Sequence, residues 1–153
     1  MSIEYRRITP YALDLLVSTR IEVLRAANRL GNDADLSRVE GESRDYYIRA
    51  LADGSHVGYL AFDGGDFVGA GGVSYYRVMP TYHNPTGEKA YIMNMYVRPA
   101  YRRLGIATHL LDLLVQDARA RGIVEITLEA TDVGRPLYEK YGFTPMKHEM
   151  ELV

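Results

Sequence analysis

The sequence contains no cysteine and no tryptophan, and only three of its 153 residues are phenylalanine. The absence of cysteine excludes disulfides, zinc–cysteine sites and a cysteine nucleophile, but it leaves the redox compartment open. No segment approaches the roughly 20 apolar residues that a membrane-spanning helix needs, and residues 1–7 lack the apolar core of a signal peptide. We therefore expect a cytoplasmic protein that does not interact with membranes.

An excess of one charge is also absent, because 18 Lys and Arg residues are balanced by 20 Asp and Glu residues. A general nucleic-acid binder would be strongly basic, so we expect no nucleic-acid partner. The four histidines are scattered without the spacing of metal ligands, and we expect no metal site. The length suits one domain, residues 1–153, with a core that needs no metal or disulfide.

Strand and helix patterns alternate along the first half of the chain. We expect a strand, two helices and two hairpin strands over residues 3–8, 10–30, 41–53, 56–62 and 67–78. Glycines cluster at 69–72, which indicates a β-bulge or a close backbone approach. A loop with Pro and Gly follows at 79–88, and it is a reasonable place for a substrate lid.

The second half is expected to alternate strand, helix, strand, helix and strand over residues 90–97, 104–121, 123–129, 134–141 and 146–152. If the first of these helices is a crossover, the strands on either side of it must be parallel. The pattern predicts one α/β domain with a mixed, mostly antiparallel sheet flanked by helices.

The segment 91–108 runs from a strand through a basic turn directly into a helix. The first N–H groups of a helix have no intrahelical partner and the helix dipole is positive there, so anions bind at this point. Gly105 allows close backbone approach to a ligand, Ala107 keeps the next position small, and Arg102 and Arg103 add positive charge. The turn therefore predicts a site for a phosphorylated ligand.

A second motif follows at 135–143, where a short helix carrying Tyr138 leads into a Gly-Phe turn. Taken with Arg102-x-x-Gly105-x-Ala107, this segment resembles the signatures of the GCN5-related N-acetyltransferase (GNAT) superfamily. The resemblance covers nearly the whole chain and is sharpest between residues 90 and 143. It implies a GNAT-like fold in which the parallel strands 90–97 and 123–129 splay apart at their C-terminal ends.

The resemblance also implies acetyl-CoA as the acetyl-donor cosubstrate. Its pantetheine arm would pair with the strand backbone exposed by the splay, and its pyrophosphate would bind at the basic turn. A backbone N–H near Val97 would polarise the thioester carbonyl. The implied cofactor-binding residues are Met95, Val97, Arg102, Arg103, Leu104, Gly105, Ile106, Ala107, Thr108 and Tyr138.

Tyr138 matches the tyrosine that acts as general acid in this superfamily. A thiol has a pKa of about 8.5 and a tyrosine one of about 10, so a nearby phenol can donate a proton to the departing thiolate. The structural alternative is a helix tyrosine that packs its ring against the sheet.

The general base is less well defined by the sequence. The strand 90–97 holds no carboxylate, although many relatives carry one there, and the candidates are Glu88 at its entrance and a water held by Asn94. Glu129 and Glu22 are alternatives, and each of these acids could equally be a solvated surface charge.

We therefore expect an N-acetyltransferase that moves an acetyl group to a primary amine of a small molecule by direct attack. The alternatives are a protein or peptide N-acetyltransferase and a catalytically silent acyl-CoA-binding module. We expect the acceptor between the first two helices, loop 79–88 and the splayed strands, where Glu22, Glu88 and Glu129 would attract a cationic amine. The oligomeric state is left open, a homodimer included.

Overall fold

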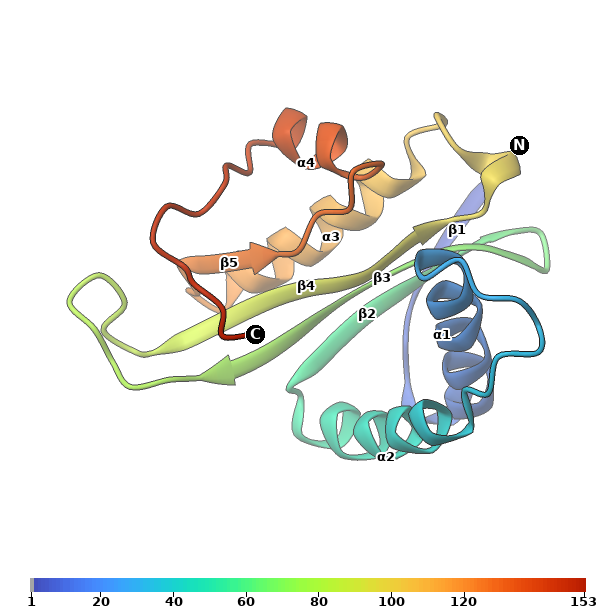
Figure 1. The fold of residues 1–153 in the computed structure, drawn as a ribbon, viewed down its shortest axis with the longest axis horizontal. Helices are drawn as coiled ribbons and strands as arrows, with labels where there is room; N and C mark the ends of the chain where they lie inside the picture. The colour runs from blue at the N-terminus through green and yellow to red at the C-terminus, as the bar shows by residue number, and fades with distance from the viewer. Residues whose placement is uncertain (1) are drawn as a thin grey trace.

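Five strands form one sheet whose spatial order follows the sequence (Figure 1). The structure is a computed structural model that describes residues 2–153, so the start of the expected domain at Met1 lies outside the described residues. The strands are β1 (Ile3–Arg7), β2 (His56–Asp63), β3 (Asp66–Arg77), β4 (Glu88–Val97) and β5 (Glu125–Leu128). Neighbours are antiparallel from β1 to β4, and β5 is parallel to β4, which confirms the mixed, mostly antiparallel sheet.

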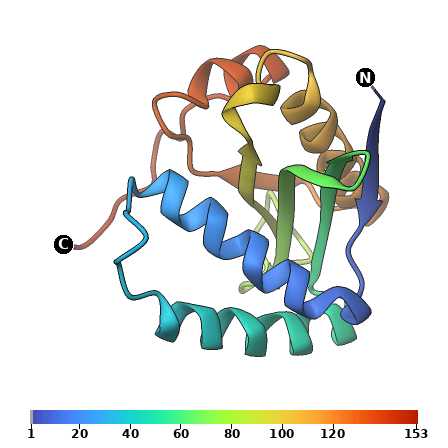
Figure 2. The same ribbon diagram turned by 90° about the vertical axis from the view of Figure 1, so that its right-hand side faces the viewer.

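Helices cover both faces of the sheet. Helices α1 (Leu13–Ala27) and α2 (Ser37–Asp53) lie on one face, and α3 (Ile106–Ala120) and α4 (Arg135–Tyr141) lie on the other (Figures 1 and 2). Each packs an apolar stripe against the strands, and the stripe of α3 is fully buried. Its buried residues are Ile106, Leu110, Leu111, Leu114, Val115 and Ala118.

The two parallel strands pair over only part of the length of β4. Residues Lys89–Ile92 of β4 pair with Glu125–Leu128 of β5, and β4 then continues for five further residues to Val97. The backbone of this last part of β4 has no neighbour on the β5 side among the described residues. The predicted splay between the parallel strands is therefore confirmed.

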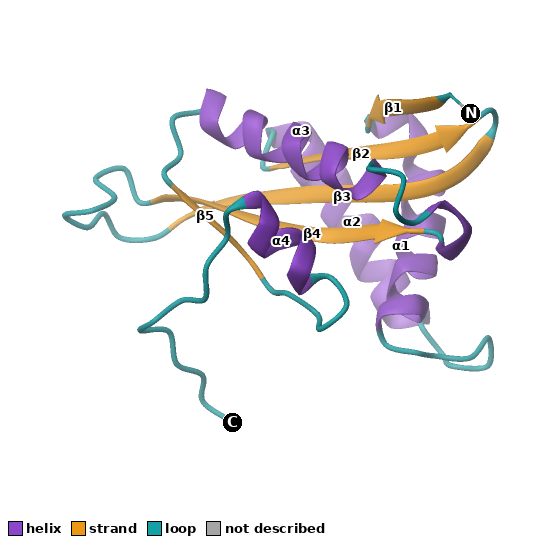
Figure 3. Ribbon diagram, turned by 90° about the horizontal axis from the view of Figure 1, so that it is seen from above, coloured by secondary structure: helices purple, strands orange, loops and turns teal. Residues whose placement is uncertain are grey.

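The predicted last strand, 146–152, is wrong. Residues 144–153 form no regular element, and Met150 and Leu152 are almost fully exposed. A strand is stable only when it pairs, and this segment leaves the domain instead of lying along the outer edge of β5 (Figure 3).

Several element boundaries also differ from the expected ones. Helix α2 begins at Ser37 and not at Gly41, because Asp35 accepts a hydrogen bond from the Ser37 N–H and starts the helix earlier. A 3₁₀ turn at Pro10–Ala12 precedes α1. Leu104, expected on the apolar stripe of its helix, lies before α3 and is exposed. Strand β4 begins at Glu88, so Glu88 belongs to the sheet.

Candidate active site

The turn that begins α3 presents a row of free backbone donors. Among the described residues, no acceptor bonds to the N–H groups of the six residues 103–108, and the first bond into the helix is donated by His109 to the Gly105 carbonyl. Arg103 and Gly105 have φ angles of 63° and 83°. Left-handed positions of this kind occur in turns whose successive backbone N–H groups bind anions.

Positive charge flanks these donors. Arg102 and Arg103 are exposed, and Arg102 Nε donates to the Val97 carbonyl at 3.2 Å, which holds this guanidinium at the end of β4. No heavy atom lies within 4 Å of the position that a Cβ of Gly105 would occupy, so the space beside this glycine is open. Buried Ile106 anchors the helix start beneath the turn.

A β-bulge in β4 follows directly after its pairing with β5 ends. Gly72 of β3 pairs with Met93 and Ala70 pairs with Tyr96, so Gly71 alone stands opposite Asn94 and Met95. Asn94 adopts a φ of 59°. The bulge confirms the irregularity that the glycines at 69–72 predicted, and the extra residue is on β4.

The bulge changes which way the side chains of β4 point. The Met93 sulfur lies 3.5 Å from the Ser74 hydroxyl and Asn94 Oδ1 lies 3.0 Å from Arg20 of α1, so two consecutive side chains face α1 and α2. Met95 packs among residues that contact α3. The predicted pantetheine-binding backbone, at Met95 and Val97, therefore lies beside α3 in the part of β4 that pairs with β3 but has no partner on its β5 side among the described residues.

Tyr138 has a buried ring and a free hydroxyl. The residue is 8% exposed and belongs to the same core cluster as Ile92, the residue at which the pairing of β4 and β5 ends. Its hydroxyl makes no hydrogen bond to the described residues. No buried side-chain oxygen among these residues lacks a partner, so the Tyr138 hydroxyl must be accessible to solvent. Burial raises the pKa of this hydroxyl. With Leu128 and Phe143, Tyr138 lines a cavity of about 210 Å³.

Glu88 lies far from Asn94, the other candidate for the proton of the amine. Glu88 begins β4, six residues before Asn94, so the two lie roughly 20 Å apart along the strand. Glu88 and loop 79–87 are at the opposite end of the sheet from the turn that begins α3 (Figures 1 and 3). Glu129 follows β5 and is exposed.

Glu22 is held in an ion pair. Its carboxylate accepts two hydrogen bonds from Arg98, at 2.9 and 2.8 Å, and the Arg98 guanidinium holds the pKa of Glu22 below its usual range. A carboxylate stabilised in this way is a weak base. Glu22, paired with Arg98 just after the end of β4, and Glu88, at the start of β4, therefore do not lie together.

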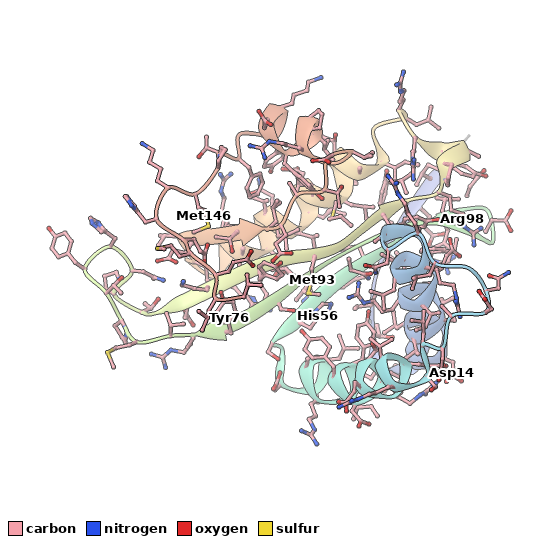
Figure 4. The ribbon with its side chains drawn as sticks, in the orientation of Figure 1. Asp14, His56, Tyr76, Met93, Arg98 and Met146 are labelled. Carbon is pink, nitrogen blue, oxygen red and sulfur yellow. The ribbon has the colours of Figure 1, made fainter. Side chains whose placement is uncertain are left out.

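Sequence reasoning missed a polar network on the α1 and α2 side of the sheet. The Tyr46 hydroxyl lies 2.9 Å from His56 Nδ1 and 2.7 Å from Ser74 Oγ, and Ser74 in turn contacts the Met93 sulfur. Figure 4 labels His56 and Met93 of this network. Burial, and then the nearby charge of Arg20, lower the pKa of His56 to about 4, so this imidazole is neutral at pH 7. No local motif marks these residues, which come from four different elements.

No helix among residues 2–153 is long and apolar enough to cross a membrane. No group of three or more His, Cys, Asp or Glu side chains in the same residues is placed to hold a metal ion.

Comparison with known proteins identifies the family that the chain matches. Residues 23–143 match the model of the acetyltransferase (GNAT) family. Among curated proteins, glucosamine 6-phosphate N-acetyltransferase of Trypanosoma brucei brucei is 27% identical over 75 residues, which are 49% of this chain and 51% of that protein. The chain thus aligns with about half the length of this relative.

Solved structures match over nearly the whole chain. A predicted acetyltransferase from Clostridium acetobutylicum, solved with acetyl-CoA, is 35% identical with a TM-score of 0.89 over 99% of this chain and 96% of that one. A GCN5-related N-acetyltransferase from Ralstonia eutropha is 28% identical with a TM-score of 0.82 over 99% of both chains. The chain therefore belongs to the acetyltransferase (GNAT) family.

Proposed function

We propose that this acetyltransferase binds acetyl-CoA with its pyrophosphate at the start of α3 and moves the acetyl group to a primary amine of a small molecule. The observation that carries the proposal is the row of six unpaired N–H groups at residues 103–108, flanked by Arg102 and Arg103. The unpaired edge of β4 beside this turn supports it, because the two amides of pantetheine can pair there as an added strand.

The backbone near Val97 has a second role in this proposal. An N–H group there polarises the thioester carbonyl and stabilises the negative oxygen as the amine attacks. A single preorganised donor of this kind contributes about 10² to 10³ in rate. The new C–N bond forms as the C–S bond breaks, and the sulfur leaves with the electron pair.

Tyr138 supplies the proton for the departing sulfur. Its hydroxyl has no hydrogen-bond partner among residues 2–153 and its pKa is raised by burial, so it carries its proton at neutral pH. The amine loses its own proton to a water held by Asn94. Glu88 stands too far along β4 to be the first choice as base, and the mechanism does not require it.

A small-molecule acceptor is supported by relatives of known substrate. The matched trypanosomal relative is a glucosamine 6-phosphate N-acetyltransferase. A structural neighbour, AAC(6')-Iy, was solved with a bisubstrate analogue of CoA and acetylneamine. Both acceptors are small amines.

Release of free thiol from acetyl-CoA tests the proposal. The acceptor panel contains small primary amines, peptides with free N-termini or lysines, and alcohols and thiols of similar size, with mass spectrometry of each product. We expect thiol release with a small amine and the acetyl group on its nitrogen. Turnover with peptides alone would contradict the choice of a small molecule, and binding of acetyl-CoA without turnover would favour the silent module.

A further inference from the structure

Arg20 is a half-buried cation without an anionic partner. Among residues 2–153, no carboxylate lies within 4.0 Å of its guanidinium, and its one hydrogen bond, from Nη1, goes to the neutral amide oxygen of Asn94 at 3.0 Å. Arg98, which lies close to the same helix, is paired with Glu22. A charge withdrawn from water is costly unless it is paired. The guanidinium of Arg20 is therefore available to bind an anionic group of a ligand.

The free edge of Arg20 has the geometry of an anion clamp. Nη1 donates to Asn94, while Nε and Nη2 make no hydrogen bond to the described residues. No buried side-chain nitrogen or oxygen among these residues lacks a partner, so Nε and Nη2 must be accessible to solvent. These two nitrogens form one edge of the guanidinium, with parallel N–H groups that open to solvent. Such an edge binds a carboxylate or a phosphate through two hydrogen bonds.

The position of Arg20 separates it from the proposed pyrophosphate site. Asn94, its partner, belongs to the bulge of β4 and points toward α1, whereas the free N–H groups at the start of α3 belong to the opposite layer (Figure 2). An anion bound by Arg20 therefore belongs to the molecule that approaches from the α1 and α2 side.

The groups around Arg20 leave its charge uncancelled. Tyr47 and His56 are its electrostatic neighbours, and both are neutral at pH 7, because burial raises the pKa of Tyr47 and lowers the pKa of His56. Glu22, two residues further along α1, is engaged with Arg98. Arg20 thus keeps its positive charge between neutral neighbours, and this charge also disfavours the protonated form of an amine bound close to it.

We infer that the acceptor carries a carboxylate or phosphate in addition to its primary amine, and that the Nε–Nη2 edge of Arg20 binds this anionic group. The inference rests on the proposed function. It replaces the sequence-based expectation of a cationic acceptor drawn in by carboxylates.

Matched pairs of acceptors test this inference. One arm compares amino acids with their carboxamides, and the other compares amino sugars with their phosphates, so the two sources of anion are separated. We expect kcat/KM to be higher for the anionic member of at least one pair. In Arg20→Gln this preference falls roughly 10- to 100-fold, as expected for the loss of hydrogen bonds to a charged group.

Two control variants and one binding measurement accompany these pairs. Arg49→Gln removes the same charge from an exposed position of α2 and should keep the preference. Arg20→Lys keeps the charge but loses the two-pronged edge, and should recover the preference only in part. Calorimetry of acetyl-CoA with Arg20→Gln should give the wild-type affinity, which shows that the variant is folded and that the donor site is separate.

The outcomes distinguish the inference from the proposed function. Equal kcat/KM for neutral and anionic acceptors in the wild type, or an unchanged preference in Arg20→Gln, overturns the inference while amine acetylation stands. Absence of turnover with every amine overturns both.

Discussion

Tyr138 has a ring that is packed in the core and a hydroxyl that makes no hydrogen bond to the described residues. Removal of the oxygen alone should leave the packing with Phe143 intact, since a phenylalanine ring fills the same space. Tyr138→Phe should therefore lower kcat by about 10² to 10⁴, the usual contribution of a general acid. Steady-state kinetics with both substrates varied measures this effect.

Tyr141 provides a control on the same helix for this prediction. Its hydroxyl donates to Asp112 at 2.8 Å on the surface, so Tyr141→Phe should keep kcat near the wild-type value. If Tyr138→Phe also keeps it, Tyr138 has only the packing role that the sequence left open.

His56 should make the protein less stable in acid. Its pKa is lowered from 6.5 to about 4 in the folded state, mainly by burial, so the unfolded chain binds a proton more readily than the folded one between these pH values. The stability that neutral His56 contributes is complete above pH 6.5 and is lost as pH falls to about 4. At about 1.4 kcal/mol per pKa unit, this loss amounts to about 3 kcal/mol.

Urea unfolding as a function of pH measures this contribution. His56→Gln cannot titrate and should lose less free energy of unfolding between pH 6.5 and 4 than the wild type does. His83→Gln, at an exposed position, should follow the wild type. A His56→Gln curve parallel to the wild-type curve would mean that folding does not lower the pKa of His56.

Single residues of the candidate site could be predicted from the sequence where they belong to a local motif, and they were missed where they do not. Tyr138 and the turn 102–108 stand in contiguous patterns, so their places could be predicted, and their roles stay predictions. Arg20 and Asn94 are 74 residues apart and meet only because α1 packs over the bulge of β4. The sequence does place Arg20 among the apolar positions of its helix, four residues after Leu16 and four before Leu24, but it does not show which side chain Arg20 meets there.

Among the elements, β4 contributes most to the candidate site. Its bulge depends on Asn94, whose φ of 59° is unfavourable for most side chains and least so for Gly, Asn and Asp. Asn94→Gly removes the amide but keeps this conformation accessible, and should change stability little. Asn94→Val places a β-branched residue there and should cost about 1 to 3 kcal/mol of unfolding free energy.

Chemical denaturation of both variants checks this prediction. Equal stability of Asn94→Gly and Asn94→Val would contradict a left-handed backbone at this position. Because both variants lose the contact with Arg20, any activity difference between them reports the bulge itself.

Most elements could be predicted from the sequence, because their apolar periodicity and turn residues are local. The strand 146–152 could not, because a strand depends on a neighbour that its own sequence does not reveal. The end of pairing at Ile92 is a similar case. It depends on the length of β5, which was expected over 123–129 and covers only Glu125–Leu128.

For the whole molecule, the two proposed binding sites lie on opposite faces of the sheet, near the end of β4. The end of β4 lies between the layer of α3 and α4, with the row of free N–H groups, and the layer of α1 and α2, with Arg20 (Figure 2). A donor molecule bound on one side and an acceptor on the other would meet at the bulge. The resemblance to known sequences predicted the first side, whereas the second required the structure.

The most direct test of the account is acetyl-CoA binding, by calorimetry, to two variants of Gly105. Asn and Asp both tolerate the φ of 83° found there, and they differ mainly in charge beside the expected pyrophosphate. We expect Gly105→Asp to bind acetyl-CoA much more weakly than Gly105→Asn, with equal thermal stability of the two variants. Equal affinity for acetyl-CoA in both variants and in the wild type would contradict a pyrophosphate site at the start of α3.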